Sequence, residues 1–284
     1  MKKRIIFMLS VLLTLSLSAC SSAAQLSGVS GGSASGSGEN VSEAGVISGE
    51  RMEDKGTDTG SLSESYAVGD IILEDGAVVK AEELTGIDRD NVPAAVVVEV
   101  KNDGSVLGVG VHRSEAPLPW ALDGTAGIST QFADIVCTQE NADGEASADY
   151  IGDTDGSDNW DVICAGDPQG ASEAARNYPA FDFVNTYAET CGLSGEYSSG
   201  WYLPSIAELY VVYENREAVN TSLQKIYGLD CDAAMDGLGT NWYWSSSQSA
   251  STHDYAWFVH YYNGYACDCL KNFTNLHVLA VRKF

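Results

Sequence analysis

The chain has 284 residues, with 40 acidic and 15 basic side chains and a formal net charge of −25. A field of that sign repels phosphate backbones and anionic lipid, so we exclude nucleic acid as a partner. The length is sufficient for one domain with a sizeable core, beside segments that do not fold.

The amino-terminal segment has the order of an export signal. Basic residues at positions 2–4 precede an apolar run over 5–17, which is too short to span a bilayer and is typical of a signal peptide. Residues 17–20 read Leu-Ser-Ala-Cys and resemble a bacterial lipobox, whose cysteine carries diacylglycerol and palmitate chains. We predict a signal peptide at 1–19 and lipidation at Cys20. An ordinary secretory signal with an incidental cysteine is the alternative.

A Ser/Gly-rich segment follows the cysteine. Residues 21–65 contain 21 Ser or Gly and no aromatic side chain, so they cannot bury enough apolar surface to offset chain entropy. We therefore expect the lipidated Cys20 and a flexible tether over 20–65, and one folded domain over 66–284. Loss of the three basic residues with the signal peptide takes the formal charge from −25 to −28, which suits an exported surface protein.

The folded part reads as α+β with many short strands. Asp75-Gly76 predicts a tight hairpin turn, and Ser205 with Glu208 predicts a capping box that opens a helix reaching about residue 215. Asn263-Gly264 predicts a second hairpin turn. The other expected elements are strands at 94–100 and 106–111, helices at 171–176, 181–190 and 222–227, and mostly strands from 242 onward.

The last 44 residues have an unusual composition. They hold 11 of the 27 aromatic residues and three of the four histidines, but only two of the 40 acidic residues. The stretches at 242–248 and 278–282 look like ordinary strand and core. Between 252 and 276, bulky, polar and thiol side chains alternate without the period of a helix or a strand. Such a mixture makes a poor core and a good binding face.

Several segments resemble the C-type-lectin-like domains related to the formylglycine-generating enzyme. They are Gly-Trp-Tyr-Leu-Pro-Ser-Ile-Ala-Glu-Leu at 200–209, Trp-Tyr-Trp-Ser-Ser-Ser-Gln at 242–248, Ala256-Trp257 and Val281-Arg282, and, less distinctively, 155–160 and 178–181. Together with the lipobox and the tether, they make the chain similar to the Treponema variable protein family, the targets of diversity-generating retroelements. The resemblance implies a C-type lectin-like fold with two or three helices around antiparallel sheets.

The resemblance also implies a mechanism for the irregular composition. In such systems a reverse transcriptase misreads adenines of a template, which spreads asparagine codons over a restricted set of residue types. Gln248, Trp257 and Lys271 fall outside that set and would be fixed. The implied variable region is about 241–284, and its ligand-binding positions would be Thr252, His253, Asp254, Tyr255, Phe258, His260, Tyr262, Tyr265, Cys267, Asp268, Cys269, Leu270, Asn272, Phe273 and Leu276.

Aromatic side chains would dominate such a face. A tyrosine ring is large and has few rotors, so it loses little entropy on contact. We expect Tyr255, Tyr262 and Tyr265 to be anchors and Phe258 and Phe273 to supply apolar area. Phe258, Tyr262, Tyr265 and Phe273 should then lie at the surface. The expected core positions are Trp242, Trp244 and Trp257.

Catalytic and metal-binding alternatives rest on the same region. Cys267 and Cys269 suggest a formylglycine-generating-enzyme-like oxidase, but a pair separated by one residue departs from that family's arrangement. The polar and thiol groups lack the spacing of a familiar zinc or copper site; these are His253, His260, His277, Cys267, Asp268 and Cys269. We expect no metal, no cofactor and no enzymatic activity.

An acidic segment near the middle of the chain suggests calcium. Oxygen-bearing side chains alternate there around Gly156 as at the start of an EF-hand loop, but Cys164 occupies the twelfth position, where a glutamate is required. We favour a polar loop whose side chains hold turns. The residues concerned are Asp153, Asp155, Ser157, Asn159 and Asp161.

Cysteine pairing is left open by the sequence. A disulfide is plausible in an exported protein among Cys137, Cys164, Cys191 and Cys231. A bond between Cys267 and Cys269 would be strained.

The leading hypothesis is a lipid-anchored protein of the bacterial outer membrane, displayed at the cell surface as a receptor or adhesin. We expect a monomer that contacts the membrane through Cys20 and binds an unknown protein or glycan at its variable face. The alternatives are the oxidase and, third, a structural envelope protein.

Overall fold

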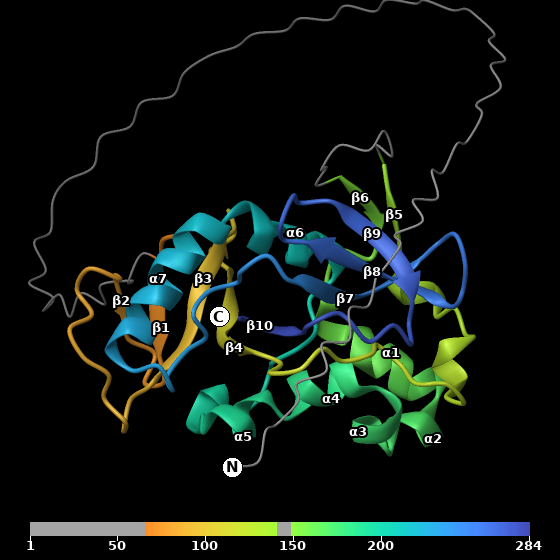
Figure 1. Cartoon of the computed structure of the whole chain (residues 1–284), viewed down its shortest axis with the longest axis horizontal. Coiled ribbons are helices and arrows are strands. Elements are labelled where there is room, and N and C mark those ends of the chain that lie inside the picture. The colour runs from red at the N-terminus through yellow and green to blue at the C-terminus, as the bar shows by residue number, and fades with distance from the viewer. Residues whose placement is uncertain (1–65, 141–148) are drawn as a thin grey trace, which may run out of the picture. The chain divides into compact units, whose positions relative to one another are not determined.

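Two five-stranded sheets and a set of short helices form the α+β fold, which confirms the predicted class at that level (Figure 1). The computed structural model describes residues 66–140 and 149–284. The predicted signal peptide at 1–19, Cys20 and the tether lie outside the described residues. In the described part no helix is both long enough and apolar enough to cross a membrane.

The first sheet is antiparallel and joins the two ends of the folded chain. Its order is β10-β4-β3-β1-β2, and helix α7 covers one face of it (Figure 1). The predicted turn at Asp75-Gly76 is confirmed, because Gly76 has a φ of 88° and its N–H donates to the Leu73 carbonyl. The strands are β1 (Ile71–Leu73), β2 (Val78–Val79), β3 (Pro93–Val100), β4 (Val106–Arg113) and β10 (Leu279–Lys283).

The second sheet carries the region of irregular composition. Its order is β6-β5-β7-β8-β9, with β5 and β7 parallel and the other pairs antiparallel. Strand β9 therefore forms one edge. The strands are β5 (Val136–Gln139), β6 (Tyr150–Gly152), β7 (Trp242–Ser249), β8 (Tyr255–His260) and β9 (Ala266–Leu270).

The helices of the described residues are more numerous than the two or three that the resemblance implies. The described residues include α1 (Asn159–Gly166), α2 (Pro168–Ala171), α3 (Ala174–Asn177), α4 (Pro179–Asn185), α5 (Tyr187–Cys191), α6 (Ile206–Glu214) and α7 (Arg216–Leu229). The helix predicted at 181–190 is interrupted at Thr186, which caps one helix and precedes the next. The helix predicted at 222–227 extends over all of α7, because buried side chains recur along one stripe.

The capping box that opens α6 is confirmed, and it reaches further than predicted. Ser205 Oγ accepts from the Glu208 N–H, and a Glu208 carboxylate oxygen accepts from the Ser205 N–H. The same buried carboxylate accepts from the Gly156 N–H at 2.9 Å and from the Tyr202 hydroxyl at 2.7 Å. One glutamate therefore fastens the loop before α1 to the start of α6.

Strand β7 passes between two apolar clusters, although its middle is polar. Trp244 belongs to the cluster beneath α1 and α4, and Tyr243 to the cluster beneath α6 and α7. Residues 245–249 are fully buried. Their polar groups are paired: Ser246 N–H donates to the Pro204 carbonyl, and Ser247 Oγ accepts from the Ile206 N–H. Burial without loss of hydrogen bonds makes this strand a fixed element.

Candidate binding face

The edge of the second sheet brings most of the predicted positions together. Strand β8 pairs with β7 on one side and with β9 on the other, so that Phe258 lies opposite both Trp244 and Cys267. Side chains opposite each other across a ladder share a face. Short turns at the two ends of β9 carry the remaining positions.

Thirteen of the fifteen predicted positions are exposed or half-exposed. The exposed ones are His253, Tyr262, Tyr265, Leu270 and Phe273; the half-exposed ones are Thr252, Asp254, Tyr255, His260, Cys267, Asp268, Cys269 and Asn272.

Two of the fifteen are buried, and our expectation of exposure was wrong for them. Phe258 is 5% exposed because its ring packs against Trp242 and Trp244 across the ladder. Leu276 is 0% exposed, and its carbonyl accepts from the Leu118 N–H in the crossing that precedes β10. Both side chains belong to the apolar cluster around Trp244.

The expected core role of the three tryptophans is confirmed fully for Trp244 and in part for Trp242 and Trp257. Trp244 is fully buried. Trp242 and Trp257 are half-buried and pack against the two clusters from their edges. The Trp257 indole N–H donates to the Cys137 carbonyl at 2.9 Å, which fixes its orientation.

Large apolar side chains are exposed at both ends of β9. Tyr262 and Tyr265, in the turn before the strand, are 77% and 43% exposed. Leu270 and Phe273, at the end of the strand and in the turn after it, are exposed as well. Exposed aromatic area of this kind is typical of protein-binding surfaces.

The predicted turn at Asn263-Gly264 is confirmed and leaves no room for a side chain. Gly264 has a φ of 77°, and its N–H donates to the His260 carbonyl at 2.7 Å. A Cβ atom at this position would lie 2.4 Å from the Tyr213 ring on α6. The tip of the turn is therefore seated on the helix, with Tyr262 directed away from it into solvent.

A buried lysine holds the loops that flank the face. Lys271 is 0% exposed, and its ammonium donates to the carbonyls of Gly127 at 2.7 Å, Thr130 at 3.0 Å and His253. It also lies 4.9 Å from the centre of the Trp120 ring, a favourable place for a cation. The side chain thereby joins the loop before β8 to the body of the domain.

Several predicted positions are engaged in internal hydrogen bonds. Asp268 accepts from Ser251 at 2.9 Å and from Ser249. The Asn272 amide donates to Asp123 at 2.8 Å. These polar groups therefore have a set orientation, whereas the large apolar side chains of the face project outward.

A shallow hollow adjoins the face beside Trp242. Its volume is about 300 Å³, and its lining was not among the fifteen predicted positions. The Trp242 and His260 rings lie 4.0 Å apart, centre to centre, and are tilted by 34°, so aromatic surface continues from the face into the hollow. The sequence indicated this hollow only by its closeness to the region of irregular composition. The lining residues are Thr240, Asn241, Trp242, Asn275 and His277.

The two thiols of the face lie in a setting that favours the protonated form. Burial raises the pKa of the Cys269 thiol to about 12 and also raises that of Cys267. Thiolates are the nucleophilic and metal-binding species. Neither residue forms a disulfide. The same holds for the other cysteines of the described residues, which are Cys137, Cys164, Cys191 and Cys231.

The acidic loop before α1 uses its oxygens for turns. Asp155 Oδ1 accepts from the Ser157 N–H, and its other oxygen contacts Lys283. Asp153 accepts from the Asn159 amide at 2.7 Å. Across residues 66–140 and 149–284, no three or more His, Cys, Asp and Glu side chains form a group that could hold a metal ion.

Comparisons with known proteins give a likeness of fold. No family profile matches the chain, and no curated protein matches it in sequence. The crystal structure of a fimbrial protein from Bacteroides ovatus is similar, with a TM-score of 0.51 and 17% sequence identity. The match covers 77% of this chain and 49% of the fimbrial protein, so it spans about half the length of that structure. At this identity the likeness concerns the fold alone.

The role of Lys271 leads to a prediction for stability. Lys271→Met should lower the free energy of unfolding by about 3 kcal/mol, because buried carbonyls lose their donor. Urea unfolding followed by tryptophan fluorescence would measure the change. The exposed Lys101→Met serves as the control and should cost no more than about 0.5 kcal/mol. Equal effects of the two substitutions would contradict the assignment.

The same lysine predicts a pH dependence. Burial lowers the pKa of the Lys271 ammonium to about 7, against about 10.4 in an unfolded chain. Between these values the unfolded state binds more protons, so this group makes folding more stable as pH rises. The difference in unfolding free energy between the wild type and Lys271→Met should therefore grow from pH 7 to pH 10. A difference in unfolding free energy that stays constant with pH would refute the lowered pKa of Lys271.

Proposed function

We propose that this protein is a lipid-anchored surface lipoprotein whose carboxy-terminal region forms a variable ligand-binding face on a C-type lectin-like domain. One observation carries the proposal. Of the three residues that adenine-directed mutagenesis cannot produce, Gln248 and Lys271 are fully buried and hydrogen-bonded and Trp257 is half-buried. Thirteen of the fifteen positions that it can produce are at least partly exposed. A division of that kind lets side chains vary without loss of the core.

The surface chemistry favours a macromolecular ligand. Tyr262, Tyr265, Leu270 and Phe273 present exposed apolar area along one sheet edge, and such side chains act as anchors in protein interfaces. The hollow beside Trp242 adds amide groups next to an indole. An adhesin or receptor for a protein or glycan on another surface fits this combination.

The export signal gives the setting. Lipidation at Cys20 and a tether over 20–65 would hold the domain at the outer membrane of the bacterial envelope, clear of the lipid. A fold similar to that of a fimbrial protein suits a role outside the cell. The formal charge of −25 keeps such a domain soluble.

The oxidase alternative has weaker support. It needs a reactive thiolate at Cys267 or Cys269, and burial raises the pKa of both thiols. We therefore favour a binding role for these positions.

Comparison of the gene with its neighbourhood tests the proposal. We expect a near-copy of the coding region for residues 241–284 downstream, with adenines where the two copies differ, and a reverse transcriptase gene beside it. Differences between sibling copies should fall on the thirteen exposed or half-exposed positions and spare Phe258, Lys271 and Leu276, which the core requires. Substitutions spread evenly over 66–284 would overturn the proposal.

The tolerance of the face can be measured directly. Replacing Tyr262, Tyr265, Leu270 and Phe273 together by Ser should lower the free energy of unfolding by no more than about 2 kcal/mol, because each side chain is exposed. The single substitution Phe258→Ala should cost about 3 kcal/mol or more. Thermal and urea unfolding would compare them. A larger loss in the fourfold variant would mean that these side chains hold the fold.

A further inference from the structure

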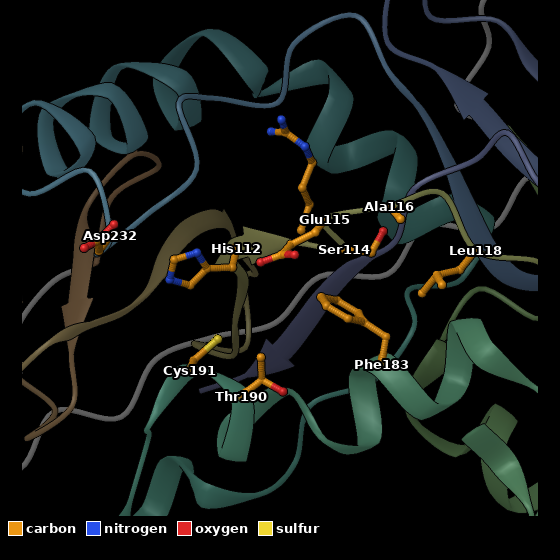
Figure 2. A pocket seen from close by; sticks show the side chains of 10 residues that line it. His112, Ser114, Glu115, Ala116, Leu118, Phe183, Thr190, Cys191 and Asp232 are labelled. Atoms are coloured by element: carbon orange, nitrogen blue, oxygen red, sulfur yellow. The ribbon is translucent and has the colours of Figure 1, made fainter. Parts of the chain in front are cut away.

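A second concave site lies beside the end of β4. A cavity of about 460 Å³ opens between the end of β4 and helices α4 and α5. It shares no lining residue with the fifteen positions of the face. Figure 2 shows Phe183 and Leu118 on one side of the hollow, and His112 and Asp232 on the other, with Glu115 between them.

The walls are fixed by the frame of the domain. The Ser114 N–H donates to the Val278 carbonyl at 3.0 Å, which holds the chain after β4 against the segment before β10. The His112 N–H donates to the Tyr187 hydroxyl at 3.1 Å, which ties the other wall to α5. The cavity is therefore preformed, as binding sites for small molecules usually are.

The charges of the lining are unequal. Glu115 and Asp232 are exposed at the cavity, and neither forms a salt bridge within the described residues. The positive group, Arg113, is already engaged, since its guanidinium donates to the Gly237 carbonyl at 2.8 Å and pairs with Asp236. Burial lowers the pKa of the His112 imidazole, which favours its neutral form.

Two exposed carboxylates that form no salt bridge within the described residues, together with an apolar wall, define the ligand by its chemistry. The negative field of the chain raises the local concentration of cations at such a site. A hydrophilic metal ion would leave Phe183 and Leu118 uncovered, whereas an organic cation matches both walls.

We infer that this cavity binds a small organic amine, with its ammonium group beside Glu115 and Asp232 and its apolar body against Phe183 and Leu118. The volume lies within the range of small-molecule sites, roughly 300 to 1,000 Å³. The inference is independent of the proposed ligand-binding face. Either site can be tested without the other.

Calorimetric titration of the folded chain with phenethylamine tests the inference. We expect a dissociation constant on the order of 1 mM or below. Phenethyl alcohol and phenylacetate, which keep the ring but lose or reverse the charge, should bind at least about fivefold more weakly. The double variant Glu115→Gln with Asp232→Asn should weaken phenethylamine binding by a similar factor.

Matched variants separate this site from a general effect of charge. Glu189→Gln removes an exposed carboxylate of α5 that does not line the cavity, and it should leave binding unchanged. Thr190→Trp places a large ring at the exposed margin and should abolish binding while the melting temperature stays the same. Absence of phenethylamine binding, equal binding of the alcohol, or unchanged affinity in the double variant would each overturn the inference.

Discussion

The end of the edge strand and the loop before β8 depend on one buried lysine side chain. Lys271 stands at the end of the edge strand, and its three carbonyl partners belong to loops that are distant in sequence. Its own backbone carbonyl accepts from Trp120 and Ala121, and its N–H donates to the Asp254 carbonyl. Side chain and backbone together therefore hold the end of β9 and the loop before β8 against the body of the domain.

The buried Glu208 carboxylate is a second group that supports the same sheet, from the side of α6. The Glu208 carboxylate joins the capped start of α6 to the loop before α1, and the buried serines of β7 pair with that helix start. The edge strand and its turns project from this frame. Polar groups with full hydrogen bonding specify one arrangement more sharply than apolar packing does.

The features that could be predicted from the sequence are those that a few neighbouring residues determine. The turns at Asp75-Gly76 and Asn263-Gly264 and the capping box at Ser205 each depend on a few neighbouring residues, and all three are confirmed. Phe258 and Leu276 were wrongly predicted to be exposed, because their burial depends on partners across the sheet and in the segment before β10. The cavity beside His112 likewise arises from tertiary packing, which leaves no periodic signal in the sequence.

The seat of Gly264 on Tyr213 has a consequence for how such a surface can change. With the turn tip in contact with a helix, an inserted or deleted residue would shift the pairing of β8 with β9 and turn side chains to the opposite face. Antibody loops gain variety partly through differences in length. Here a substitution at an exposed position would change the chemistry of the surface, whereas a change of length would change its outline.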